Sequence, residues 1–251
     1  MSGATSPHTP LGKRVYGAMW ILCQSICLSL FGIRARFAED VPPDGGLIVL
    51  STHQSLLDPV LLGVACERRL SSLARHSLFR IQPLGWLITQ LDAVPIDRDA
   101  PGVAALKAII ARLKAGAAVV IFPEGTRTST GRPAPLKNGF VILARRSGVP
   151  ILPVAIVGAW ECWPRARWFP RPGRVRLEFG RVIPADEIAR LDDATLMATC
   201  AAQLDELDRR GRDALRGRSR SPRGVLRHQV RTAAQDAAEK RRAAAPIEGT
   251  T

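Results

Sequence analysis

The sequence contains no recognisable metal-binding pattern and no disulfide framework. No Cys-x-x-Cys pair occurs, and neither the cysteines nor the histidines have partners at the spacing of metal ligands. These absences argue against a zinc site and indicate free thiols in a reducing compartment. The residues concerned are Cys23, Cys27, Cys66, Cys162, Cys200, His8, His53, His76 and His228.

A serine nucleophile is also poorly supported. The chain has no Gly-x-Ser-x-Gly sequence, the strand-to-helix turn that presents a nucleophilic serine in many hydrolases. Ser55 follows His53 by two residues, and side chains at this separation seldom face each other in the geometry that activation requires. The sequence therefore argues against chemistry through an acyl-serine.

Basic residues far outnumber acidic ones. The formal net charge is +14 and the pI is near 11.0. Residues 209–251 carry twelve Lys or Arg and four Asp or Glu, and their little apolar periodicity predicts a flexible basic tail. Such a charge favours an anionic partner, but it does not choose among phospholipid headgroups, a phosphorylated substrate, an acidic carrier protein and nucleic acid.

Residues 15–33 contain no charged side chain and are flanked on both sides by basic residues. This pattern predicts a membrane-associated helix. Its length could just span a bilayer, but polar residues and two glycines dilute its hydrophobicity, so a helix lying in the interface fits equally well. A cleaved signal peptide is disfavoured because no small-x-small cleavage site follows. A helix packed on the domain core is the remaining alternative.

Four apolar runs have the length and composition of β-strands, and helix-like segments alternate with them. Three runs are continuous, as expected of strands buried on both faces, and the fourth alternates and predicts a more exposed strand. This order predicts an α/β fold with a mixed, largely parallel central sheet flanked by helices. The predicted strands are Gly46–Thr52, Ala117–Phe122, Ile151–Val157 and Val175–Phe179. One predicted helix lies between Pro101 and Gly116, a second runs from Gly139 to Arg146, and a third includes Leu196, Cys200, Leu204 and Leu207.

These features divide the chain into three parts. Residues 1–40 hold an N-terminal tail and the membrane-associated helix, residues 41–208 form one α/β domain, and residues 209–251 form the basic tail. One domain is expected because single-core α/β folds reach roughly 250 residues before they divide.

His53 and Asp58 follow the first predicted strand and are separated by five positions. Across a turn at a strand end, this spacing lets the carboxylate orient the imidazole as a general base for a hydroxyl nucleophile. Asp58 also precedes Pro59 and an apolar stretch, so on its own it would be interpreted as a helix N-cap. The sequence downstream favours the catalytic interpretation.

Four short blocks follow one another along the chain: His53 to Asp58 (H-x4-D), Ile96–Arg98, Phe122–Arg127 (F-P-E-G-T-R) and Val149–Pro153. In this order they resemble the blocks of the 1-acylglycerol-3-phosphate acyltransferase family of glycerolipid acyltransferases. The resemblance covers roughly residues 45–160, and the coincidence of all four blocks is specific. Two positions depart from the commonest pattern: Thr52 stands where asparagine is frequent, and the second block lacks a preceding glycine.

The resemblance implies direct acyl transfer from a thioester to a hydroxyl. His53 would remove the proton from the acceptor hydroxyl, and Asp58 would stabilise the imidazolium. Arg98 and Arg127 are expected to bind the acceptor phosphate, because guanidinium groups recognise oxyanions with two hydrogen bonds. Glu124 is expected to orient an arginine or bind an acceptor hydroxyl.

The remaining residues of the F-P-E-G-T-R block shape its turn. Gly125 would permit a tight backbone bend, and Thr126 would supply a local hydrogen bond. Lys137 either adds positive charge nearby or is simply exposed. The oxyanion donors are expected among backbone amides, either near His53 or after Phe122.

A segment that clusters three tryptophans with arginines, residues 158–171, suits a bilayer interface near the mouth of an active site. Packing of one or two of these tryptophans in the core is the alternative. Together with the basic charge, this segment predicts an enzyme at the cytoplasmic face of the inner membrane, in contact with an anionic membrane surface.

The sequence thus predicts an acyltransferase that needs no cofactor and acylates 1-acylglycerol 3-phosphate to phosphatidate, with acyl-CoA or acyl carrier protein as the co-substrate. A different lysophospholipid or a lyso-amino-acid lipid is the alternative acceptor. A non-catalytic basic protein that binds membranes or nucleic acid is a remote alternative, since the basic tail lacks interleaved aromatic residues. No specific nucleic acid is expected.

Overall fold

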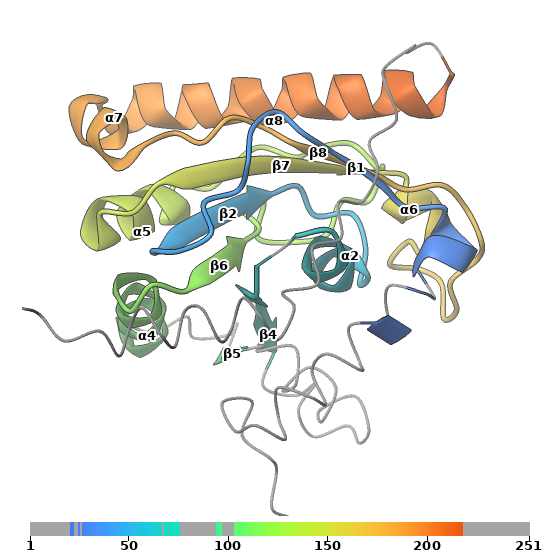
Figure 1. Ribbon diagram of the computed structural model, residues 1–251, viewed down its shortest axis with the longest axis horizontal. Coiled ribbons are helices and arrows are strands. Elements are labelled where there is room, and N and C mark those ends of the chain that lie inside the picture. The colour runs from blue at the N-terminus through green and yellow to red at the C-terminus, as the bar shows by residue number, and fades with distance from the viewer. Residues whose placement is uncertain are drawn as a thin grey trace, which may run out of the picture.

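A six-stranded sheet with helices on both faces forms the centre of the protein (Figure 1). The computed structural model describes residues 21–22, 25, 27–66, 68–75, 94–96 and 103–217. The strand order is β1-β8-β7-β2-β6-β3, and a separate parallel pair is formed by β4 and β5. The strands are β1 (Arg34–Phe37), β2 (Leu47–Ser51), β3 (Leu70–Ser71), β4 (Leu73–Arg75), β5 (Val94–Ile96), β6 (Ala118–Ile121), β7 (Ile151–Val157) and β8 (Arg176–Phe179).

The prediction of a mixed, largely parallel sheet is confirmed. Neighbouring strands are parallel except for β7 and β8, which are antiparallel. The helices are α2 (Asp58–Ala65), α4 (Val103–Lys114), α5 (Gly139–Ser147), α6 (Ala159–Cys162), α7 (Ala185–Arg190) and α8 (Asp193–Leu215). The three continuous apolar runs became β2, β6 and β7, and the predicted amphipathic segments became α4, α5 and α8.

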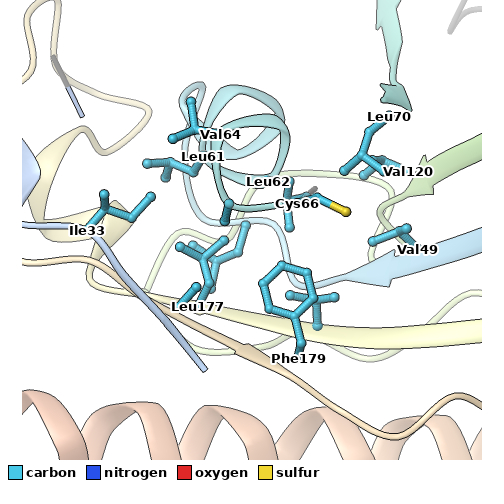
Figure 2. Close-up of a cluster of buried hydrophobic side chains, with 14 of the residues drawn as sticks. Ile33, Val49, Leu61, Leu62, Val64, Cys66, Leu70, Val120, Leu177 and Phe179 are labelled. Atoms are coloured by element: carbon cyan, nitrogen blue, oxygen red, sulfur yellow. The ribbon is translucent and has the colours of Figure 1, made fainter. Parts of the chain in front are cut away.

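Two apolar cores lie on opposite faces of the sheet, because successive side chains of a strand point to opposite sides. Val49 of β2 packs in the first core and its neighbours Ile48 and Leu50 pack in the second. Figure 2 shows the first core, where Leu61 and Leu62 of α2 face Leu177 and Phe179 of β8. The second core is covered by α4, α5, α7 and α8, through buried residues such as Ile109, Leu113, Phe140, Ile188, Leu196, Cys200 and Leu204.

The strands β1 and β8 run opposite to β2, β6 and β7. Val157, the last residue of β7, pairs with Arg176, the first residue of β8, which in turn pairs with Arg34, the first residue of β1. The edge at which β2, β6 and β7 end, here called the carboxyl edge, is therefore the edge at which β1 and β8 begin. The segments that precede β1 and β8 consequently lie at the carboxyl edge.

The prediction of an exposed strand at Val175–Phe179 is wrong, and strand β1 was not predicted. All four residues of β8 are buried, because β8 lies between β1 and β7 and α8 packs on it. Its two charged side chains, Arg176 and Glu178, are buried as an ion pair with Nε and Oε1 2.9 Å apart, which explains the alternating pattern. Strand β1 lies within residues 1–40 but belongs to the sheet, so the domain begins earlier than predicted.

The predicted start of the basic tail at Arg209 falls inside a helix. Helix α8 continues to Leu215, and Gly217 follows with a positive φ of 72°, a common conformation just after a helix. Residues 218–251 lie outside the described residues.

The predicted membrane-associated helix is described only in part. Residues 27–31 are helical, with Cys27 and Phe31 packed in the first core and Leu28 and Leu30 exposed. Within the parts of the chain that the structure describes, no helix has both the length and the apolar character needed to cross a bilayer.

Candidate active site

The two strongest sequence motifs meet at the carboxyl edge. His53 follows β2 and Phe122 follows β6, and these strands are neighbours in parallel register with Leu50 opposite Ile121. Parallel neighbours bring the residues after their last positions to the same edge of the sheet. The topology therefore places the turns that carry the two motifs beside each other.

Residues 53–58, here called the catalytic turn, are organised by one carboxylate oxygen. Oδ2 of Asp58 accepts a hydrogen bond from Nδ1 of His53 at 2.8 Å and from the backbone N–H groups of Gln54 and Ser55 at 2.6 and 2.8 Å. Among the residues described, Oδ1 of Asp58 has no hydrogen-bond partner. The side chain of Asp58 is completely buried, and it fixes both the imidazole and the backbone of the turn.

Asp58 does not cap α2, which was the alternative interpretation. The N-cap residue is Leu57, it makes no side-chain capping bond, and Asp58 is the first residue of the helix. Its carboxylate bonds to the residues before it instead. Because an ionised carboxylate only accepts, the Nδ1–H of His53 donates to Asp58, which leaves Nε2 with its lone pair as the basic nitrogen.

The second motif fixes the position of His53. The rings of His53 and Phe122 are stacked, with centroids 4.0 Å apart and an interplanar angle of 17°. The backbone N–H of His53 donates to Oε1 of Glu124 at 2.9 Å, and its carbonyl accepts from the N–H of Thr128 at 2.8 Å. His53 is thereby held by contacts to its ring and to its backbone.

Glu124 joins three segments of the site. Its Oε1 accepts from His53, and its Oε2 accepts from the backbone N–H of Ala134 at 3.2 Å. The residue is only 3% exposed. Sequence reasoning expected contacts to an arginine or an acceptor hydroxyl, whereas the contacts seen here are to backbone amides. The sequence does not indicate such contacts, because every residue other than proline has the same backbone N–H donor.

Burial raises the pKa of the Glu124 carboxyl to about 7, and the charges of Asp58 and Asp208 act in the same direction, while the two backbone bonds oppose the shift. An acid with a raised pKa takes up a proton on folding between its unfolded and folded pKa values. We therefore expect the stability of the wild type to fall, relative to Glu124→Gln, as the pH rises from about 4.5 to about 7.

This expectation is checked by the difference in midpoint of chemical unfolding between the two proteins from pH 4.5 to 8. The glutamine variant cannot accept both backbone bonds, so it is expected to be the less stable protein at low pH. A difference that does not change with pH would show that Glu124 is ionised throughout this range.

The turn after Glu124 brings a lysine close to the backbone. Gly125 has a positive φ of 73°, and a Cβ placed on it would lie 2.9 Å from Nζ of Lys137. Lys137 is exposed, and its ammonium group lies over this turn, so both sequence interpretations of Lys137 hold. Thr126 is exposed and Arg127 is half-buried. Arg98 lies outside the described residues.

Most backbone amides of the catalytic turn already have acceptors. The N–H of His53 is bonded to Glu124, and those of Gln54 and Ser55 are bonded to Asp58. These three groups are thus unsuited to stabilise an oxyanion. Of the two locations that the sequence analysis named, the turn after Phe122 remains.

The hydroxyl of Ser55 has a structural bond. Its Oγ donates to the carbonyl of Trp163 at 2.9 Å and accepts from the N–H of Leu57 at 3.2 Å. This arrangement agrees with the sequence argument against a serine nucleophile. Thr52, which departs from the family pattern, accepts from the N–H of Ile156 through Oγ1 at 2.9 Å and so links β2 to β7.

The described part of the chain shows no metal centre. In residues 27–66, 68–72 and 105–217, whose side chains the structure describes, no group of three or more His, Cys, Asp and Glu residues is arranged to hold a metal ion. The described cysteines Cys27, Cys66, Cys162 and Cys200 are buried and unbridged.

The chain is similar to characterised proteins over most of the described domain. Residues 32–157 match a family described as Acyltransferase. The chain is 30% identical to a 1-acyl-sn-glycerol-3-phosphate acyltransferase of Bacillus subtilis over 70% of its own length and 85% of that protein. It is 35% identical to the Pseudomonas aeruginosa protein of the same name, over 62% of this chain and 61% of that one.

A solved structure shares the fold. The crystal structure of a 1-acyl-sn-glycerophosphate acyltransferase from Thermotoga maritima superposes with a TM-score of 0.71 at 27% sequence identity, covering 84% of this chain and 83% of that chain. The mixed sheet and its flanking helices are therefore those of a protein for which an activity has been assigned.

Proposed function

The chain belongs to the acyltransferase family, and from this membership we propose that it transfers a fatty acyl group from a thioester to the free hydroxyl of 1-acylglycerol 3-phosphate, giving phosphatidate. The observation that carries the proposal is the buried pair of His53 and Asp58, held against the F-P-E-G-T-R turn at the carboxyl edge. Relatives whose names specify this reaction support the choice of acceptor.

In the proposed mechanism, His53 is the general base. Its Nε2 takes the proton of the acceptor hydroxyl while the oxygen attacks the thioester carbonyl. The negative charge of Asp58, bonded to Nδ1 at 2.8 Å, stabilises the imidazolium that forms. When the tetrahedral intermediate collapses, the carbon–sulfur bond breaks and His53 returns the proton to the departing thiolate. The ester and the free thiol are the products.

The positive groups beside the base fit a phosphate. Lys137 lies over Gly125, and Arg127 lies two residues further along the same turn. A guanidinium and an ammonium so placed would neutralise an acceptor phosphate and hold its neighbouring hydroxyl near His53. Arg98, from the second block, is proposed as a further phosphate ligand. The oxyanion of the intermediate is assigned to the backbone amides of the turn after Phe122.

The donor is proposed to be acyl-CoA or acylated carrier protein, since both present a thioester and need no cofactor for transfer. The first experiment is to measure transfer of radiolabelled acyl groups from each donor to lysophosphatidate in detergent micelles. Product with either donor supports the proposal. A panel that replaces lysophosphatidate with other lysophospholipids, lyso-amino-acid lipids or monoacylglycerol tests the acceptor, and monoacylglycerol is the one of these whose headgroup carries no charged group. If only a different acceptor is acylated, the proposed acceptor is wrong, but the proposed acyl transfer to a hydroxyl still holds.

We also propose that the carboxyl edge faces an anionic membrane surface at the cytoplasmic side of the inner membrane. Residues 163–173, here called the aromatic loop, precede β8 and carry Trp168 and Phe169, which are 90% and 80% exposed. Arginines of the same loop are exposed as well: Arg165, Arg167 and Arg171. Aromatic and cationic side chains together suit the boundary between acyl chains and anionic headgroups.

The aromatic loop lies beside both the catalytic turn and the helix before β1. Trp163 accepts from the hydroxyl of Ser55, and the N–H of Gly173 donates to the carbonyl of Leu30 at 3.0 Å. Each neighbour adds an exposed apolar side chain, such as Leu56 in the turn and Leu28 in the helix. These three segments supply the surface on which a lysolipid could pass from the bilayer to His53.

Replacing both exposed aromatic residues, Trp168→Ser with Phe169→Ser, is expected to weaken binding to vesicles of phosphatidylglycerol and phosphatidylcholine by at least about tenfold, because each buried aromatic ring contributes roughly 1.5–3 kcal/mol. Sedimentation with the vesicles measures it. Ile142→Ser on α5 is the matched control, an exposed apolar residue outside the three segments. Equal binding by the double variant and the wild type would exclude the aromatic loop as a membrane contact.

A further inference from the structure

Helix α8 is connected to the catalytic turn through a single carbonyl group. The carbonyl oxygen of Gly131 accepts a hydrogen bond from Nε2 of Gln54 at 3.1 Å and a second one from the guanidinium of Arg212. Gln54 belongs to the catalytic turn, and Arg212 lies in the last part of α8, where the sequence analysis predicted the tail. No residue of α8 belongs to a motif by which the family was recognised.

Both donors are themselves held in place. Oε1 of Gln54 accepts from the N–H of Trp160 at 3.2 Å, so both ends of its amide are bonded. Arg212 forms a two-pronged pair with Asp208, with Nε–Oδ2 and NH2–Oδ1 separations of 2.6 and 2.9 Å. The side chains of Arg212 and Asp208 are only 13% and 7% exposed. The two hydrogen bonds of this buried pair fix the orientation of the guanidinium. Removing either partner would leave the other charge buried and unpaired, which destabilises the fold.

Gly131 is fitted to this position. Its φ is 74°, a conformation that side chains other than hydrogen rarely adopt, and a Cβ would lie 3.1 Å from the ring of Trp160. Gly131 thus packs closely beside the indole, and its carbonyl is held by Gln54 and Arg212. From there the connection continues through the N–H of Gln54 to Oδ2 of Asp58, the oxygen that orients His53.

We infer that Asp208 and Arg212 are positioning residues for the acyl transfer reaction: they act through Gly131 and Gln54 to hold the catalytic turn in its working geometry. The inference rests on the proposed function, because its kinetic test measures acyl transfer. The contacts from which it is drawn do not depend on that function. Displacement of a catalytic base by a fraction of an ångström lowers the rate of the chemical step more than it lowers substrate binding.

The kinetic test compares Arg212→Met with Arg209→Met. Arg209 is a close neighbour on α8, but it is exposed and pairs with Glu206 and Asp213. We expect Arg212→Met to lower kcat about tenfold with KM within about twofold, and Arg209→Met to change neither. In a double-mutant cycle with Gln54→Ala, the losses should be less than additive, because both changes release the same carbonyl.

A second readout does not depend on the substrate. The N–H groups of Gln54 and Ser55 are bonded to Asp58, so their hydrogen exchange reports the order of the turn. Exchange in a peptide spanning residues 52–58 should be several-fold faster in Arg212→Met than in the wild type or Arg209→Met, at a temperature where all three are folded. Arg212→Lys, which keeps the charge but lacks the two-pronged geometry, should lie between.

The outcomes separate the two proposals. Faster exchange with a fall in kcat supports the inference. Unchanged exchange overturns it, whether or not kcat falls, because Arg212 would then act by another route. If neither the wild type nor any variant acylates a lysolipid, the proposed function fails. The hydrogen-exchange result then decides by itself whether α8 orders the catalytic turn.

Discussion

His53→Ala is expected to lose at least about three orders of magnitude in kcat for acyl transfer. A general base of this kind contributes roughly 10²–10⁴-fold, and without the imidazole the charge of Asp58 has no imidazolium to stabilise. The KM for lysophosphatidate should change little, since the proposed phosphate ligands lie on another turn. Initial rates with labelled donor, at saturating concentrations of both substrates, measure the effect.

The variant must be shown to be folded. His53 stacks on Phe122 at the edge of the first core, so its loss leaves a small space, and a modest drop in melting temperature is expected. Arg190→Ala, which removes an exposed ion pair with Asp186 on α7, serves as a purification and stability control. A folded His53→Ala protein that keeps more than about a tenth of the wild-type rate would exclude His53 as the base.

Asp58→Asn should lower kcat by roughly 10²–10³-fold, and the structure indicates why. The two backbone N–H groups of Gln54 and Ser55 require an acceptor at the position of Oδ2, so the amide oxygen of the asparagine will occupy it. The Nδ1–H of His53 then still has an acceptor, and its tautomer is kept. What is lost is the negative charge that stabilises the imidazolium, worth about 4 kcal/mol at 4 Å and an effective dielectric of 20.

Asp58→Ala provides the matched comparison. It removes the charge and also leaves the amides of Gln54 and Ser55 buried without an acceptor, at roughly 1–3 kcal/mol each. We expect the alanine variant to melt well below the asparagine variant and to be the slower enzyme. If the Asp58→Asn variant turns over at the wild-type rate, the charge of Asp58 does not contribute to catalysis, and its role is to hold the turn through hydrogen bonds.

The sequence was sufficient to predict the strands β2, β6 and β7 and the pairing of His53 with Asp58. Continuous apolar runs such as Ile151–Val157 are short and rich in β-branched residues, which favours a buried strand over a helix. His53 and Asp58 follow such a run at a distinctive spacing. The meeting of the two motif turns follows from the topology, because the neighbouring parallel strands β2 and β6 end at one edge of the sheet. All of this is local information or a rule of topology.

The remaining features depend on partners distant in sequence. The alternation of Arg176 and Glu178 indicated an exposed strand, but α8 covers that face and the two charges pair beneath it. Arg212 was assigned to a tail because arginines are frequent there, whereas its partner Asp208 lies one turn earlier and its acceptor 81 positions away. The packing of α8 on β8 and the contact of Arg212 with Gly131 join segments far apart in the sequence, so no local periodicity indicates them.

The hydrogen bonds of Asp58 also limit how many protons move in the reaction. If the imidazolium of His53 passed its Nδ1 proton onward, the proton would arrive at Oδ2, which already accepts from two backbone amides. Neutralising that oxygen would weaken both of these bonds in a fully buried position. In the proposed mechanism we therefore expect Asp58 to act as a fixed counter-charge and not as a proton carrier. One proton, passed between the acceptor oxygen, Nε2 and the leaving sulfur, would then account for the whole catalytic cycle.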